Sequence, residues 1–501
     1  MWASRILLLV PQLILVPYLL GTIGESGYGI YALVWSLIMS LEQLQVSLQQ
    51  GVIKYSAGFL AQGRMDEVNK VVSSSFVYSV LLAVVACAGT LVTAAFYKDP
   101  TSQIGSALVV VGIMLLFIVP LTPYMAVIQS RQRYYVGALA ETISKYVSLL
   151  AVVVWFEIVG PSVEALIIIM AGMLFLSRLA QVPIAHRLVP GLQNRPRLFN
   201  GMHFRLIAAF GAVTVLVSLC LAANSTGVRW LMDLLVSTRF VAHLAIMLMP
   251  AMLLSQLISA LSITVMPATS AYEATGNLQM LQELLIRGIR YTTILALAGL
   301  LAAAPLMRNV MSVWVGPEYV FLAPFALALF AGEAFIQTTG IAHHMLKGLG
   351  KLRVVVFIYS IGLVILPIGL ILIVFKIWHN PYIAVTLGLT AGQLVCGCLN
   401  IGFCANAVHA SLREVFIRAY AQPLLVAAVV CLAAFGSVTM GGINGFTARI
   451  SVSVLSVLLF LGSCYFYIAT AAEQRQVKGL AQAISKRSTV VRRMGPTFKK
   501  L

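Results

Sequence analysis

The sequence predicts an all-α polytopic membrane protein with about fourteen transmembrane helices, and two observations support this prediction. Of the 501 residues, 60% are hydrophobic and only 10% are charged, whereas a soluble domain carries about 25% charged residues. Apolar runs of the length that a bilayer requires, about 20 residues each, follow one another with only short polar stretches between them. A soluble chain cannot bury this much apolar surface, so lipid is the expected solvent.

The predicted spans follow from the positions of these apolar runs. The first run begins directly after Met1 and has no small-residue cleavage site, which predicts an uncleaved first span. The pattern is interrupted most strongly over 222–240, where Arg229, Asp233 and Arg239 occur. The predicted spans are 2–22, 28–54, 71–97, 104–130, 137–159, 163–188, 203–228, 238–267, 288–311, 320–346, 354–377, 382–408, 414–440 and 446–471.

The distribution of Lys and Arg tests this map and orients it. If the N-terminus lies in the cytoplasm, 27 of the 33 Lys and Arg residues fall on the cytoplasmic side, as the positive-inside rule requires. Both termini are therefore predicted to be cytoplasmic. The same bias explains most of the net charge of +18, so no nucleic-acid partner is expected. The tail over 472–501 is either a solvated topological anchor or a segment that binds anionic membrane lipids, which attract each basic residue by about 1 kcal/mol.

The sequence predicts neither an enzyme nor a bound cofactor or metal. It contains no Gly-rich nucleotide loop, no metal-spaced His/Asp cluster and no nucleophile elbow. The Cys396-x-Cys398 pair lies in an apolar run and is interpreted as packing rather than as a metal site. The chain is therefore expected to transport rather than to catalyse.

Two pairs of turns indicate an internal repeat. A short motif with Gly63 follows the second span and a similar motif with Gly276 follows the eighth, 213 residues later. Basic turns at Arg131 and Lys347 end the fourth and tenth spans, 216 residues apart. Two matches at nearly one offset predict a duplicated six-helix unit, and an even number of helices gives a parallel repeat. The predicted units are bundles over 1–190 and 191–408, two extra helices over 409–471, and the basic tail over 472–501.

Polar residues inside the spans are the candidate functional residues, because an ionisable group at mid-bilayer is costly and marks function by default. In span two, Glu42, Gln45 and Gln49 share one helical face and Lys54 lies on a neighbouring face. This polar surface is interpreted as a cavity wall, with a hydrogen-bonded seam against another helix as the alternative. The full candidate set for a substrate cavity is Glu42, Gln45, Gln49, Lys54, Arg239, His243, Gln256, Glu333 and Gln337, of which Glu42 and Glu333 are also candidates for ion coupling.

The order of several motifs resembles the lipid-linked oligosaccharide (O-antigen type) flippases of the multidrug/oligosaccharidyl-lipid/polysaccharide exporter superfamily. The resemblance spans the first twelve helices and rests on three segments: a Gly-x-x-x-Tyr-Gly-x-Tyr stretch over 24–31, the turn over 62–64, and a Gly-Pro-Glu-Tyr segment over 316–319 followed by Ala-Pro. One departure is that Asn224 and His243 stand where this family often has an acidic residue and a Gly-x-Tyr, with Asp233 as the candidate substitute.

The resemblance implies a V-shaped alternating-access transporter in the bacterial inner membrane. Its implied substrate is an undecaprenyl-pyrophosphate-linked oligosaccharide of an O-antigen or exopolysaccharide pathway, moved from the cytoplasmic to the periplasmic leaflet. It further implies polysaccharide polymerase and export proteins as partners, and Lys54, Arg239 and Arg229 as groups that meet the pyrophosphate. The alternatives are a multidrug cation exporter of the same superfamily and a membrane glycosyltransferase or polymerase.

Overall fold

The computed structural model describes residues 2–97, 103–262, 265–440 and 446–468, and every regular element within these ranges is helical. The basic tail predicted over 472–501 lies outside the described residues. Thirteen helices of the described part are long and apolar enough to cross a membrane. The longest, α1 (Trp2–Ala61), changes direction at Gly24, where φ is 70°. It therefore contains the first two predicted spans, which gives fourteen crossings.

The first bundle consists of five further helical segments packed around α1. Its core contains Leu19 and Leu33 of α1 together with Leu108 and Leu166, all fully buried. The segments after α1 are α2 (Met65–Phe96), α3 (Gln103–Ile118), α4 (Thr122–Ser130), α5 (Tyr134–Ile158) and α6 (Val163–Leu188), with α3 and α4 forming one span through the short 3₁₀ turn Val119–Leu121.

The second bundle repeats this arrangement and is followed by two more spans. Its helices are α7 (Gly201–Ala222), α8 (Val228–Leu235), α9 (Thr238–Ser262), α10 (Val265–Ala274), α11 (Leu278–Trp314), α12 (Ala323–Thr338), α13 (Gly340–Gly348), α14 (Leu352–Tyr359), α15 (Leu366–Trp378) and α16 (Pro381–Ala407). The last two spans comprise α17 (Leu412–Val415) continued by α18 (Gln422–Met440), and α19 (Phe446–Ser463).

Several predicted helix ends differ from the structure by six residues or more, among them the end of the second span (predicted 54, observed Ala61) and the start of the third (predicted 71, observed Met65), and two further cases have a clear local cause. The ninth span was predicted from 288, but α11 begins at Leu278 because the Asn277 side chain accepts the backbone N–H of Met280 at 3.1 Å. The seventh span was predicted to end at 228, but a π-helical turn over Ala223–Gly227 carries the helix on into α8. The hydrophobic pattern did not predict the start of α11 or the continuation into α8, because polar residues interrupt the apolar run at both places.

The two turns of the predicted repeat share a backbone conformation. Gly63 and Gly276 both have positive φ, 70° and 65°. The next residue donates its N–H to a carbonyl five residues back in each copy, at 2.9 Å from Arg64 to Phe59 and at 3.0 Å from Asn277 to Tyr272. This is the hydrogen bonding of a helix that ends in a left-handed residue. The two turns of the predicted repeat therefore end their helices in the same way.

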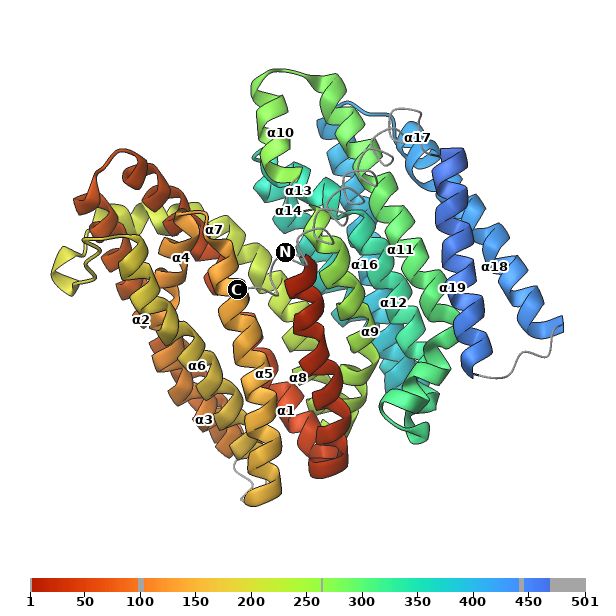
Figure 1. Ribbon diagram of the computed structural model, residues 1–501, viewed down its shortest axis with the longest axis horizontal. Helices are drawn as coiled ribbons and strands as arrows, with labels where there is room; N and C mark the ends of the chain where they lie inside the picture. The colour runs from red at the N-terminus through yellow and green to blue at the C-terminus, as the bar shows by residue number, and fades with distance from the viewer. Residues whose placement is uncertain (1, 98–102, 263–264, 441–445, 469–501) are drawn as a thin grey trace, which may run out of the picture.

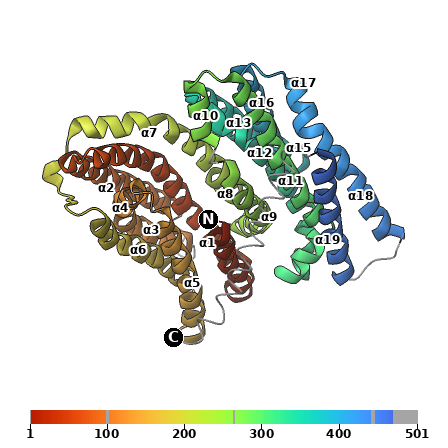
Figure 2. The ribbon, with the colours of Figure 1, turned by 45° about the horizontal axis from the view of Figure 1, so that its top comes forward.

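The two bundles form a V (Figure 1). They are in contact where Gly29 of α1 meets Thr238, and they spread toward the end that carries the α1–α2 turn and the α10–α11 turn, here called the basic end. Figure 2 shows α7 crossing from the first bundle toward the second. Early in α7, Ile207 packs against Gly51 of α1. Just beyond its end, the Asn224 side chain donates to the Leu363 carbonyl of the second bundle at 2.9 Å, so span seven connects the two bundles.

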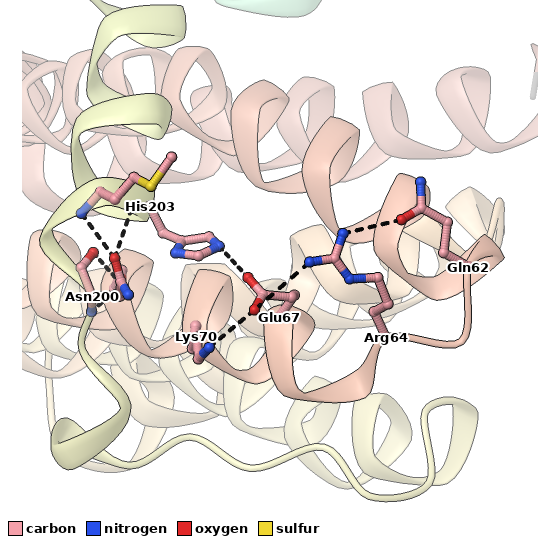
Figure 3. A network of polar contacts seen from close by, with 8 residues as sticks. Gln62, Arg64, Glu67, Lys70, Asn200 and His203 are labelled. Atoms are coloured by element: carbon pink, nitrogen blue, oxygen red, sulfur yellow. Dashed lines mark hydrogen bonds and ion pairs between the residues drawn. The ribbon is translucent and has the colours of Figure 1, made fainter.

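A polar network at the basic end holds the start of α7 to the first bundle (Figure 3). Glu67 of α2 accepts a hydrogen bond from Lys70 at 3.0 Å and forms a longer ion pair with Arg64 at 3.9 Å, and its second oxygen lies 2.7 Å from His203 Nε2. The Asn200 side chain caps α7 by accepting the N–H of Met202 at 2.9 Å. The first turn of α7 is thus fixed to α2.

Candidate functional site

A polar cavity of about 270 Å³ lies inside the first bundle, between the two halves of α1 and helices α4, α5 and α6. The walls of this cavity come entirely from the first of the two predicted repeats. Tyr31 and Trp35 form an aromatic part of the wall. The polar residues of the wall are Gln12, Glu42, Gln45, Gln49, Glu141, Ser144, Lys145, Ser148, Ser177, Arg178 and Gln181.

An ion pair between α1 and α6 is the main charged feature of this cavity. Arg178 Nη2 lies 2.7 Å from Glu42 Oε1, and the two side chains are 15% and 25% exposed. The Nη1 group of Arg178 contacts the thioether of Met125, which is a weak acceptor. Its Nε is buried and has no acceptor among the described residues. Arg178 therefore keeps N–H donors that an anion in the cavity could use.

A second, looser ion pair lies on α5. Lys145 Nζ and Glu141 Oε1 are 3.4 Å apart, one helical turn from each other, and their side chains are 32% and 53% exposed. Sequence reasoning counted Arg178 and Lys145 only as cytoplasmic anchors, and so missed both as site residues. The position of Arg178, deep within the apolar run over 163–188, was the signal that could have identified it.

Of the predicted residues on α1, Glu42, Gln45 and Gln49 line the cavity together. Gln45 and Gln49 are buried, and Gln181 of α6 is buried beside them. Lys54 lies outside the lining, is exposed, and has its ammonium 5.6 Å from the centre of the Tyr55 ring. The i, i+3, i+7 spacing thus selects one cavity-facing stripe, and Lys54 belongs to another face.

Arg239 and His243 lie elsewhere, where the two bundles meet. Glu25, in the first turn after the bend of α1, accepts from Arg239 Nε at 3.0 Å and lies 3.4 Å from His243 Nε2. The Nδ1 atom of His243 is 2.7 Å from the Tyr382 hydroxyl. This group, here called the clasp, consists of Glu25, Arg239, His243 and Tyr382, and it joins α1 to α9 and α16. Sequence reasoning missed Glu25, because its place depends on the left-handed backbone at Gly24.

Glu333 and Gln337 form a third group inside the second bundle. The Glu333 carboxylate accepts from Gln337 Nε2 at 2.6 Å and from Gln393 Nε2 at 2.8 Å, and Gln337 also donates to Ser255 Oγ at 2.8 Å. Gln256 is half-buried on α9, next to Ser255. The nine predicted residues therefore do not line one cavity: three do, two belong to the clasp, and two belong to this cluster.

The Glu333 cluster leads to a stability prediction. Glu333→Ala removes the acceptor of two half-buried amides, those of Gln337 and Gln393, and is expected to lower the free energy of unfolding by about 1–3 kcal/mol. Glu333→Gln keeps one carbonyl acceptor, so its loss should be smaller. Thermal unfolding of the purified protein in detergent measures both changes. Equal unfolding temperatures for the wild type and Glu333→Ala would show that these hydrogen bonds contribute nothing to stability.

Comparison with known proteins identifies the fold. No protein-family model matches the sequence, and no curated protein matches it. Among solved structures, an inward-facing multidrug resistance MATE family transporter of the MOP superfamily has a TM-score of 0.68 at 13% identity, covering 82% of this chain and 95% of its own. The lipid II flippase MurJ, in an inward closed conformation, also has 0.68 at 13% identity and covers 93% of this chain and 97% of its own. The chain has the fold of these transporters.

Two further details separate these neighbours. An outward-facing MATE transporter has a TM-score of 0.60 at 14% identity, covering 81% of this chain and 94% of its own. MurJ covers more of this chain than either MATE structure. About a fifth of the chain lies beyond Ala407, where the two additional spans occur.

Proposed function

We propose that this protein is a flippase that moves an undecaprenyl-pyrophosphate-linked oligosaccharide from the cytoplasmic to the periplasmic leaflet of the bacterial inner membrane by alternating access. The Nε–H of Arg178, which has no acceptor among the described residues and lies in the wall of this cavity, is the observation on which this proposal depends. A guanidinium with free N–H groups suits a pyrophosphate, because the fork geometry matches phosphate oxygens. Gln45, Gln49 and Gln181 supply amides that can hydrogen-bond sugar hydroxyls.

The two additional spans support a lipid-linked substrate. An apolar groove of about 590 Å³ runs between α11, α18 and α19 and is lined by Leu297, Leu301, Leu424 and Ala427. Such a surface suits a prenyl chain, since burying each CH₂ group contributes about 0.8 kcal/mol. A polar cavity for the headgroup and an apolar groove for the tail are the two environments that an amphipathic substrate requires.

A multidrug cation exporter is the second candidate, and one observation favours it. Glu42 lies in the same cavity as Tyr31 and Trp35, and an organic cation can bind to a carboxylate and to aromatic rings. Binding assays separate the two candidates. A flippase should bind a prenyl pyrophosphate, whereas an exporter of this type should bind a hydrophobic cation such as ethidium.

The remaining expectations about its setting belong to the same proposal. Both termini lie in the cytoplasm, the basic tail contacts anionic lipids, and polysaccharide polymerase and export proteins act with the flippase. The basic end of the V then faces the cytoplasm. Reporter fusions at Leu501 and in the loop after Phe96 test the orientation, because the first should report the cytoplasm and the second the periplasm.

The proposed activity is tested in a deletion strain. Loss of the protein should cause lipid-linked oligosaccharide to accumulate on the cytoplasmic leaflet, and a plasmid copy should reverse the accumulation. A copy with Gln45→Ala and Gln49→Ala is expected to restore less than a tenth of the wild-type transport, because each lost hydrogen bond contributes about 1 kcal/mol. Normal turnover of the lipid-linked oligosaccharide in the deletion strain would reject the flippase proposal.

A further inference from the structure

We propose that Glu42 is an internal counter-ion that occupies part of the phosphate site of Arg178 in the empty protein. Binding of the substrate phosphate then displaces the Glu42 carboxylate, which takes up one proton. This inference rests on the proposed function, and it adds a mechanism by which occupation of the cavity is linked to protonation.

The geometry at Arg178 makes the two anions competitors. A phosphate bound in the side-on fork of a guanidinium uses Nε and the neighbouring Nη2 together. In this structure Nε has no acceptor among the described residues, while Nη2 already donates to Glu42 Oε1 at 2.7 Å. One of the two donors of this fork is therefore already bound to the Glu42 carboxylate, and the other is not. A phosphate can bind both groups only if Glu42 moves away from Nη2.

The charges around Glu42 determine its protonation once it is displaced. Arg178 comes from α6 and the Glu141–Lys145 pair from α5, while α1 itself contributes the hydroxyl of Tyr31 and α4 contributes Met125, which does not titrate. The empty cavity thus holds two cations and two carboxylates. A pyrophosphate diester adds two negative charges, so an ionised Glu42 next to it is disfavoured by like-charge repulsion. Protonation of the displaced carboxylate removes this repulsion.

Linkage gives the measurable consequence. If one proton is taken up when the phosphate binds, affinity falls as the pH rises, by up to about ten-fold per pH unit. Glu42→Gln removes both the competing charge and the proton site. The Glu42→Gln variant is therefore expected to bind the phosphate more tightly than the wild type at pH 8, by about ten-fold or more. Its affinity should also lack the fall with rising pH that proton uptake by Glu42 causes.

The test uses the purified full-length chain in detergent, with farnesyl pyrophosphate as the probe and farnesol as the uncharged control. Because the terminal phosphate of the probe titrates in the same range, the pH profiles between pH 6 and 8 are compared between variants. The control variant is Glu164→Gln, an acid-to-amide change on the same helix as Arg178 but at its other end, where Glu164 binds Ser106 and Ser162. The affinity of Glu164→Gln for farnesyl pyrophosphate should depend on pH as that of the wild type does.

Each outcome decides between distinct conclusions. The inference is supported if Glu42→Gln flattens the profile relative to the wild type and Glu164→Gln does not. Calorimetry of the wild type in buffers of different ionisation enthalpy should independently show proton uptake. The inference is overturned, and the flippase proposal kept, if Glu42→Gln and the wild type share one profile, or if sodium rather than pH controls affinity. If no variant distinguishes the pyrophosphate from farnesol, the proposed substrate class is itself rejected.

Discussion

Arg178→Ala is expected to abolish transport while leaving most of the protein folded. The variant removes the donors that face the cavity and leaves Glu42 without its partner at 2.7 Å. Loss of a bidentate charge-assisted interaction should weaken phosphate binding by about a hundred-fold, because such pairs contribute about 3 kcal/mol. The cost to folding should be smaller, about 1–3 kcal/mol, because both side chains are partly exposed to the cavity, where water can solvate Glu42.

Two measurements separate these effects. Lipid-linked oligosaccharide turnover in cells reports transport, and the unfolding temperature of the purified variant reports stability. Arg187→Ala is the matched control, because Arg187 is exposed near the end of the same helix and outside the cavity. If Arg178→Ala transports as well as Arg187→Ala, the pyrophosphate does not bind in this cavity. Arg178→Lys should restore only part of the activity, since an ammonium lacks the fork.

The sequence predicted the fold more fully than the site, and the reason differs from residue to residue. Helix number and the predicted repeat follow from local patterns. An apolar run is visible in any window of twenty residues, and the left-handed conformation at Gly63 and Gly276 favours glycine. The stripe of Glu42, Gln45 and Gln49 is equally local, because helical spacing alone places the three on one face.

The partners of these residues could not be predicted in the same way. Arg178 carries the same charge as the Arg and Lys residues that anchor the cytoplasmic side, and only the packing of α6 against α1 brings it to Glu42. The clasp is formed by helices from both repeats, so it depends on how the bundles are inclined to each other. For this reason Arg239 and His243 were grouped with the cavity on sequence, although Glu25 holds them where the bundles meet.

The second large effect is expected from a substitution at Gly29, where the two bundles approach each other closely. Gly29 of α1 is buried against Thr238, and a Cβ at this position would overlap the Thr238 carbonyl oxygen. Gly29→Ala is therefore expected to force the bundles apart beside the clasp. Overpacking of this kind costs about 1–3 kcal/mol, which shifts the balance between two conformations by about ten-fold or more. Under the proposed alternating access, transport should then fall, because this end must close when the other end opens.

Thiol accessibility can show whether the bundles separate. His243 is buried in the clasp, so a cysteine introduced by His243→Cys, in a chain without its other cysteines, should react slowly with a membrane-impermeant reagent applied from the periplasm. Adding Gly29→Ala should speed this reaction about ten-fold. Gly21→Ala is the matched control: both changes raise helix propensity by about 1 kcal/mol, but a Cβ at Gly21 meets no atom within 4 Å. If the two alanine variants react at the same rate, closure does not depend on glycine at position 29, and contacts of the clasp such as Glu25–Arg239 must hold this end together.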